Sequence, residues 1–327
     1  MDSANRVRYS CIMTPENAPE PMKTSLDHLP QRKQRELARI VEVLHEEFED
    51  ALKEATADFK KRGRILKIIL FGSYARGTWV DEPHTKKGYK SDYDLLIVVN
   101  NRKLTDFAAY WHKAQDRLLR LQGVETPVNF VVHSRREVNT ALRGGLYFFV
   151  DIRKEGVILY ELDDEPLAAP RPLSPTDEYE TAKRHFVRLQ RANNSLKLAK
   201  MAAAERAMLN DAAFLLHQAM EHSYATLLLT LTNYSPPSHN LKHLRQLAED
   251  RDERLVAVWP RDRQRYSAWF NIINEAYVKA RYSDHYEISQ EALDWLAEKV
   301  SDLIAQVEII CKQHVEQLRM QAERGQN

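Results

Sequence analysis

The sequence predicts two domains of different class, a small α/β domain followed by an all-α bundle. In residues 25–161, short apolar runs of strand length alternate with amphipathic helical patterns, which is typical of an α/β domain. From residue 176 to residue 320, the apolar spacing is that of helices, and no strand-like alternation occurs. Between the two lies ELDDEPLAAPRPLSP, which contains four prolines, so residues 162–175 are predicted to be a linker.

Two terminal segments fall outside these domains. Residues 1–24 are polar and aperiodic, so we predict a disordered leader. They contain no apolar core of the kind found in a signal peptide. Met22 is an alternative start, because the periodic sequence begins just after it. Residues 321–327 are predicted to be a short tail.

The first predicted element is one long amphipathic helix over residues 25–60, with Ser25 or Asp27 as its cap and Pro30 in its first turn. A second helix is expected over residues 104–122. Four apolar runs are predicted to be strands, at 65–71, 95–100, 127–133 and 155–161. Ser134 is expected to cap a short helix that ends at Leu142, and helices of the second half are expected at 176–204, 208–233, 239–249, 261–281 and 288–320.

Composition limits the function only in part. The 327 residues carry a net charge of +1, which gives no global electrostatic reason to expect binding to DNA, RNA or a membrane. The two cysteines are too few for a disulfide framework, so a reducing, cytoplasmic location is expected. No apolar run approaches the roughly 20 residues of a membrane span, so no membrane partner is expected.

A glycine and a serine end the first predicted strand. Gly72-Ser73 leads into a turn or helix, YARG, whose free backbone N–H groups and serine hydroxyl form a possible phosphate site. By itself this pair is more typical of a plain turn with a capping serine.

Two acids, Asp92 and Asp94, open the next predicted strand. Residues i and i+2 of a strand face the same side, with Cα atoms about 7 Å apart, so the two carboxylates can share a divalent ion. A solvated strand start is the alternative for an isolated pair. Together with Gly72-Ser73 on the preceding strand, the acids favour a nucleotide site, in which one motif holds phosphate and the other holds the metal.

The motifs GSYARG (72–77) and SDYDLLIV (91–98) resemble the nucleotidyltransferase domain of the DNA polymerase beta superfamily, in its small prokaryotic form. The resemblance covers about 65–161 and implies transfer of a nucleoside monophosphate from an NTP, with ATP as the expected donor and Mg²⁺ or Mn²⁺ as the cofactor. It implies that Asp92 and Asp94 are catalytic metal ligands and that Gly72 and Ser73 hold the triphosphate. Arg76 is a further candidate for nucleotide binding.

Two features depart from that family pattern. The loop between the motifs is long, and its lysines Lys86, Lys87 and Lys90 are candidates for phosphate contact, although an exposed charged loop is usually only solvated. The family's third carboxylate falls on Asn129, and an amide is a weak metal ligand and no base. Asp151 is a candidate substitute. Binding of a metal–nucleotide complex is therefore better supported than turnover.

The second half resembles a HEPN domain over about 176–320. The resemblance depends on FLLHQAMEHSYATLLLTLTNYSPPSHNLKHLRQL (214–247) and on NEAYVKARYSDHYEIS (274–289), and a transferase domain followed by a HEPN domain is a recurrent prokaryotic order. His217 and Glu221 lie one turn apart on one helix face. The alternative for them is a half-buried histidine bonded to a glutamate.

Many HEPN proteins are ribonucleases that use an arginine and a histidine, and the matching candidates are Arg281 and His285. The helix is expected to end near YSDHYE, so Arg281 and Tyr282 can instead bind phosphate or pack against a partner. The apolar stripe between Trp295 and Cys311 is expected to be core or a dimer seam, and HEPN resemblance suggests a homodimer.

Three functions follow from these patterns. The first is a metal-dependent nucleotidyltransferase acting on a hydroxyl of a protein, an RNA or a small molecule such as an aminoglycoside. The second is a nucleotide sensor that has lost catalysis, motivated by Asn129. The third is a HEPN ribonuclease toxin restrained by the first domain, in a toxin–antitoxin or defence setting.

Overall fold

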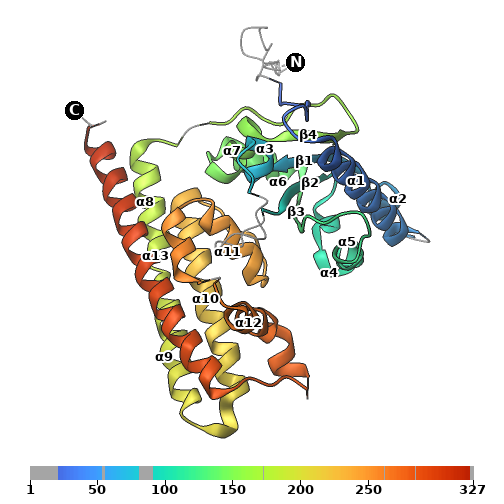
Figure 1. Cartoon of the computed structure of the whole chain (residues 1–327). Coiled ribbons are helices and arrows are strands. Elements are labelled where there is room, and N and C mark those ends of the chain that lie inside the picture. Colours follow the sequence, from blue (N-terminus) through green and yellow to red (C-terminus); the bar gives the residue numbers. More distant parts are fainter. Residues whose placement is uncertain are drawn as a thin grey trace, which may run out of the picture.

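The computed structural model of the 327-residue chain describes residues 21–53, 56–80, 91–171, 173–260, 262–283 and 285–324, and it describes no side chain for Arg206 and Tyr282. The predicted leader therefore lies almost wholly outside the described residues, as do Lys86, Lys87 and Lys90. A small sheet with its own helices lies beside a long helical bundle (Figure 1). This is the predicted fold class, which is confirmed.

The sheet has four strands in the order β3-β2-β1-β4. β1 pairs antiparallel with both β2 and β4, whereas β2 and β3 are parallel, so the sheet is mixed. All residues of β1 and β2 are buried, because both faces of the sheet are covered. The strand bounds are Ile65–Phe71 (β1), Tyr93–Val99 (β2), Val128–Ser134 (β3) and Val157–Glu161 (β4).

The helices of the first domain differ from the prediction in four places. The long helix predicted to reach residue 60 ends at Leu52, and α2 is a separate short helix. The long helix begins at Gln31, because Pro30 has extended backbone geometry, and it has no side-chain cap; Ser25 instead bonds to Asp27. The helix predicted over 104–122 is broken at Trp111. α7 was not predicted. The bounds are α1 Gln31–Leu52, α2 Asp58–Lys61, α3 Gly72–Arg76, η2 Arg102–Thr105, α4 Phe107–Tyr110, α5 His112–Leu119, α6 Arg135–Arg143 and α7 Tyr147–Glu155.

Ser134 caps α6 as predicted, within a full capping box with Glu137. The second half is helical throughout, although the segment predicted as 176–204 is two helices and the last helix continues past residue 320. Its elements are α8 Pro175–Phe186, α9 Leu189–Ala203, η3 Arg206–Met208, α10 Leu209–Thr232, α11 Leu241–Glu249, η4 Glu253–Val258, α12 Gln264–Tyr282 and α13 Gln290–Arg324.

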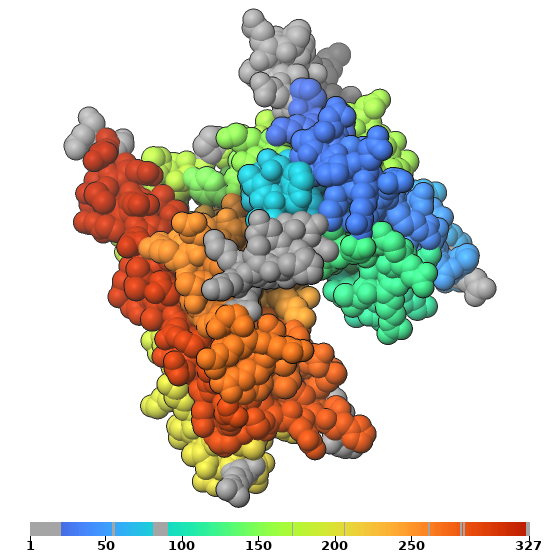
Figure 2. All heavy atoms as spheres, in the orientation of Figure 1, coloured from blue at the N-terminus to red at the C-terminus, as the bar shows by residue number. Residues whose placement is uncertain are grey.

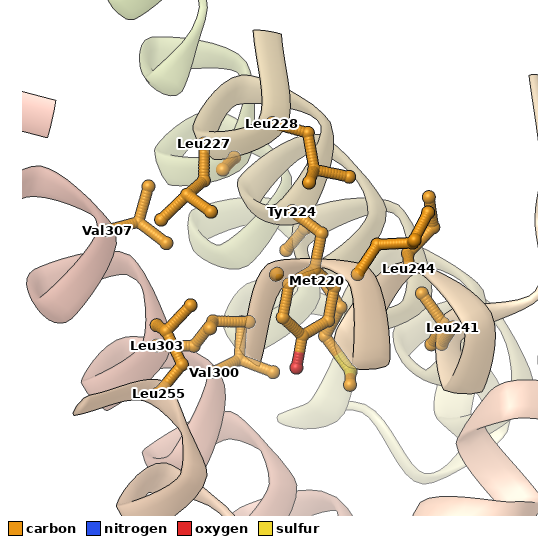
Figure 3. Packing of buried hydrophobic residues seen from close by; sticks show 14 of the residues in the cluster. Met220, Tyr224, Leu227, Leu228, Leu241, Leu244, Leu255, Val300, Leu303 and Val307 are labelled. Atoms are coloured by element: carbon orange, nitrogen blue, oxygen red, sulfur yellow. The ribbon is translucent and has the colours of Figure 1, made fainter. Parts of the chain in front are cut away.

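The bundle core is built around α10. Side chains of α13 and α11 point toward it from opposite sides, with Leu303 and Val307 on one side and Leu241 and Leu244 on the other (Figure 3). The predicted α13 stripe, including Val300 and Cys311, is buried in this core, so it is not a dimer seam. Among the described helices, none combines the length and the apolar character needed to cross a membrane.

The two faces of the sheet pack against different partners. Ile68, Leu70 and Leu95 belong to the cluster that includes α1, α4 and α5. Ile69 and Leu96 face the other way, into a cluster that continues without a break through α6 and α7 into the bundle. α11 lies between the bundle and the sheet (Figure 1). The domains therefore share one core, and this fixes α11 against the sheet.

Candidate functional site

Strand register brings the predicted motifs into one row. Phe71 of β1 is the Cα partner of Asp94 on β2, and Asp94 is in turn the partner of Asn129 on β3. Neighbouring strands are about 4.8 Å apart, so Gly72, which follows Phe71, and Asn129 lie on opposite sides of Asp94. Gly72, Ser73, Asp92, Asp94 and Asn129 thus meet at one edge of the sheet.

Gly72 is fitted closely to Asp94. Its φ of +75° is one that residues with a side chain rarely adopt, and a Cβ there would lie 2.8 Å from Asp94 Oδ2. The Ser73 hydroxyl is buried and, among the described residues, has no hydrogen-bond partner. A buried hydroxyl without a partner is costly, and a ligand oxygen would satisfy it.

The acids differ in exposure. Asp94 is fully buried within β2, and Asp92, just before the strand, is half-buried. Asn129 Nδ2 donates to Asp92 Oδ2 at 2.9 Å. Asn129, at the position where the family pattern has a carboxylate, therefore holds Asp92 in place through a hydrogen bond.

The helical domain contributes side chains that the sequence reasoning missed. Gln246 on α11 donates from Nε2 to Asp94 Oδ2 at 3.3 Å and accepts from Asn129 Nδ2 at 3.1 Å. His243 Nδ1 lies 3.9 Å from Asp94 Oδ1. One sequence signal could have found them. His243, Gln246 and Asp250 are spaced so that they lie on one face of α11, whose leucines pack on α10.

Burial and the neighbouring carboxylates act on the pKa of Asp94 in the same direction, and Arg76 opposes them. Burial raises the pKa of Asp94 well above its usual value, and the negative charges of Asp250 and Asp92 add to the shift. Arg76 counteracts it, and lies between Asp250 Oδ2 at 3.6 Å and Glu155 Oε2 at 3.7 Å. Burial also raises the pKa of Asp250.

The residues at this edge fit a hard divalent cation that is coordinated partly by protein carboxylates and partly by the phosphates of a nucleotide. Asp94 Oδ1 is buried without a hydrogen-bond partner among the described residues, which is the state expected of a ligand oxygen awaiting a cation. The described residues contain no group of three or more histidine, cysteine or acidic side chains placed to hold a metal. Mg²⁺ commonly binds through one or two carboxylates plus substrate phosphates, and the site matches that pattern.

Asp151 and Lys90 are the two remaining candidates for this site. Asp151 lies on α7 and pairs with Arg251, and both line a small cavity beside Gly72 and Arg76, on the far side of Asp94 from Asn129. It is therefore not in the place of the missing carboxylate. Lys90 lies outside the described residues.

The HEPN candidates His217 and Glu221 lie together with two residues of later segments. Glu221 Oε2 is 2.8 Å from His239 Nδ1 and 3.7 Å from His217 Nδ1, and His217 Nε2 is 3.0 Å from the His239 carbonyl oxygen. The His239 ring stacks on Tyr277 with 3.6 Å between centroids. Burial lowers the pKa of His217 to about 4, so its imidazole is neutral at pH 7.

Arg281 and His285 do not share a helix face, because α12 ends at Tyr282. The Arg281 guanidinium lies over the Tyr277 ring, 4.4 Å from its centroid, and its Nε donates to the Tyr277 carbonyl. His285 is exposed beyond the helix end. The side chain of Tyr282 lies outside the part of the chain that the structure describes.

Comparisons with known proteins place families on both domains. Residues 52–135 match the nucleotidyltransferase domain family, and residues 187–318 match the HEPN domain family. A "putative protein adenylyltransferase" of Methanocaldococcus jannaschii is 39% identical over 114 residues, which cover 35% of this chain and 92% of that protein.

A solved structure also matches at low similarity. The crystal structure of a nucleotidyltransferase-like protein from Exiguobacterium sibiricum 255-15 is 13% identical, with a TM-score of 0.27, over 81% of this chain and 77% of that chain. A TM-score this low supports no argument about the arrangement of the domains.

Proposed function

This chain belongs to the nucleotidyltransferase family, with a HEPN domain fused after its transferase domain, and we propose that it transfers a nucleoside monophosphate from an NTP to a hydroxyl group with Mg²⁺ as cofactor. The observation that carries the proposal is the row formed by Asp94 on β2, Asn129 on β3 and Gly72, which directly follows the last residue of β1. The family match supports the transferase class. The metal and the individual residue roles are our proposals.

Each side chain has a role in this scheme. Asp92 and Asp94 would hold Mg²⁺, and when bound the ion would stabilise negative charge on the reacting phosphate. The turn at Gly72 and Ser73 would hold the β- and γ-phosphates through its backbone N–H groups and the Ser73 hydroxyl. Arg76 would add positive charge beside them, and Lys90, outside the described residues, stays a sequence-based candidate for phosphate contact.

The step itself is an in-line displacement at phosphorus. The acceptor oxygen forms a bond to the α-phosphorus, the bond from that phosphorus to the bridging oxygen breaks, and pyrophosphate leaves. The hydroxyl proton is released to solvent water on the acceptor side, because the pyrophosphate departs on the opposite side of the phosphorus. Asn129 is an amide and takes no proton.

We extend the proposal to ATP as donor and a protein as acceptor, because the archaeal relative is named as a protein adenylyltransferase. A cytoplasmic setting, homodimerisation through the helical domain and a place in toxin–antitoxin or defence systems belong to the same proposal. The order of a transferase domain followed by a HEPN domain motivates the dimer and the defence setting, and light scattering on the purified chain tests the dimer.

Labelled nucleotides test the reaction. The full chain is incubated with α-labelled ATP, CTP, GTP or UTP, Mg²⁺ and cell extract, with EDTA and an Asp94→Ala variant as controls. We expect Mg²⁺-dependent label on an acceptor, strongest with ATP, and none with the variant. Tight nucleotide binding without label transfer from any of the four would overturn the transferase proposal.

A nucleotide sensor is the second candidate, and Asn129 with its bond to Gln246 favours it. Two amides occupy the place where catalysis would need a base. Calorimetry should then show Mg²⁺-dependent NTP binding that Asp92→Ala removes, with no transfer. Gain of transfer in Asn129→Asp would identify the missing carboxylate as the cause.

A further inference from the structure

A cavity of about 370 Å³ lies between the two domains, next to the transferase row. One wall is formed by Phe107, Ala108 and Gln115 of α4 and α5 with residues 129–133 of β3. The opposite wall is residues 236–240 and His243 of the helical domain. A notch separates the α4–α5 surface from the helical domain (Figure 2). The volume is in the range of small-molecule sites, about 300–1,000 Å³.

The position of the cavity corresponds to one end of an in-line reaction. Gly72 and Asn129 lie on opposite sides of Asp94 in the sheet. Attacking and leaving oxygens lie on opposite sides of the phosphorus. If the triphosphate tail lies at Gly72, the attacking hydroxyl must approach from the Asn129 side, and the cavity opens there.

The described walls of the cavity combine aromatic, aliphatic and proline side chains with uncharged amides, hydroxyls and histidines. The rings of Phe107 and Phe130 stack at 5.5 Å, and Pro236 and Pro237 face them from the helical domain. Among the described residues that line it, none is Lys, Arg, Asp or Glu. This described lining therefore has no carboxylate to neutralise the ammonium groups of an aminoglycoside and no Lys or Arg to neutralise the phosphates of an RNA end, so burying those charged groups there would be costly.

One lining side chain lacks a partner. His243 is 4% exposed, and neither of its ring nitrogens has a hydrogen-bond partner among the described residues. The other lining histidines are engaged, His133 with the Tyr234 hydroxyl at 2.8 Å and His239 with Glu221. Both bonds from the Asn129 amide nitrogen are also used, toward Asp92 and Gln246. A hydroxyl entering the cavity would therefore find a partner in His243.

We infer that this interdomain cavity is the acceptor site and that the acceptor is an uncharged hydroxyl carried on an apolar or aromatic group. The helical domain then supplies half of the acceptor site, with His243 as a specificity-determining residue. The inference rests on the proposed transfer reaction. Its ligand can be a protein side chain or a free small molecule, and the probes below distinguish them.

Ala108→Trp tests the site, because Ala108 is exposed on α4 and a tryptophan there fills the cavity from the solvent side without altering the core. Ala109→Trp is the matched control, exposed on the same helix and outside the lining. The probes are N-acetyltyrosinamide, 2-phenylethanol, a 2-deoxystreptamine aminoglycoside and a short RNA with a free 3′ hydroxyl. Binding is measured by ligand-observed NMR with Mg²⁺ and a non-hydrolysable ATP analogue.

We expect at least one uncharged probe to bind wild type and Ala109→Trp, with at least fivefold weaker signal in Ala108→Trp. Signal from the amino-acid amide alone would indicate a side-chain acceptor, and signal from the alcohol would indicate a small molecule. The inference would be overturned if wild type bound no uncharged probe, or if Ala108→Trp gave the same signal as wild type. It would also be overturned if the aminoglycoside or the RNA bound wild type and this binding was lost in Ala108→Trp.

Nucleotide binding, measured first, separates this inference from the function it rests on. Failure of wild type to bind Mg²⁺–ATP would refute the proposed function, whereas normal ATP binding with a negative cavity result refutes only the acceptor site. Retained ATP binding also shows that Ala108→Trp is folded. Gln115→Trp places a tryptophan in the same cavity from α5 and repeats the test. Its result decides whether the cavity is the acceptor site if Ala108→Trp fails to bind ATP.

Discussion

Gln246 of the helical domain donates a hydrogen bond to Asp94 of the transferase domain, with 3.3 Å between Nε2 and Oδ2. The same glutamine accepts from Asn129. Both Gln246 and Asp94 are buried. A neutral amide from the second domain thus satisfies a carboxylate that has few other partners, and the two domains are coupled at the proposed metal site.

Replacing Gln246 by glutamate should make folding depend on metal. A third carboxylate beside Asp94 destabilises the metal-free protein by about 2–3 kcal/mol, because a buried like-charge pair replaces a hydrogen bond. Mg²⁺ or Mn²⁺ should restore most of that loss. Thermal unfolding in EDTA and in excess metal measures both effects. Gln317→Glu, exposed on α13, is the control, and equal behaviour of the two variants would contradict the coupling.

Gly72→Ala should destabilise the protein by more than the backbone strain of alanine at positive φ alone. Gly72 and Gly123 both have positive φ, but a Cβ meets Asp94 Oδ2 at Gly72 and nothing within 4 Å at Gly123. Gly123→Ala therefore reports backbone strain alone, about 1–2 kcal/mol. Gly72→Ala should lose more stability and also Mg²⁺-dependent ATP binding, as shown by urea unfolding and calorimetry. Intact ATP binding in Gly72→Ala would count against a phosphate site at this turn.

The half of the site on the first domain could be predicted from sequence, because local strand rules place Gly72, Asp92 and Asp94 at adjacent strand ends. Asn129 was also predicted, because the family resemblance puts the third carboxylate at that position of the strand TPVNFVVH. His243, Gln246 and Asp250 could not be placed, because their positions beside Asp94 and Arg76 depend on how the domains dock. The α13 stripe was ambiguous for the same reason: apolar periodicity predicts burial but does not name the partner surface.

The limits of the fold prediction were local. The capping box at Ser134 was correct because its residues are adjacent in sequence. The long first helix was wrong at its start, because a proline with ψ of 147° precedes the first helical residue. α7 was missed because its apolar run, Phe148 to Val150, lacks a clear helical period over so short a length.

Asp250→Asn should strengthen nucleotide binding. Asp250 lies 3.6 Å from Arg76 beside the turn at Gly72, so it neutralises a candidate phosphate ligand and repels the triphosphate. Removing that charge should raise the affinity for Mg²⁺–ATP about three- to tenfold. Calorimetry at two salt concentrations measures the change. Asp262→Asn, an exposed aspartate before α12, should leave affinity unchanged, and weaker binding by Asp250→Asn would show that Asp250 helps to hold the ligand.

Asp94→Asn should stabilise the metal-free protein while abolishing transfer. Because the pKa of Asp94 is raised in the folded state, its ionisation costs stability, and the cost grows as pH rises from the ordinary value of 3.8 through the folded pKa. The variant should therefore gain about 1–2 kcal/mol over wild type near pH 8 and little below pH 4. Its amide oxygen can still accept from Gln246.

Urea unfolding in EDTA across that pH range measures the gain, with the exposed Asp116→Asn as control. If the free energy of unfolding of the variant exceeded that of wild type by the same amount at all pH values, the charge of Asp94 would not be the source of the gain. Saturating Mg²⁺ should reverse the order, because the cation stabilises the wild-type carboxylate and has lost a ligand in the variant. If Mg²⁺ stabilised both proteins equally, Asp94 would not be a metal ligand.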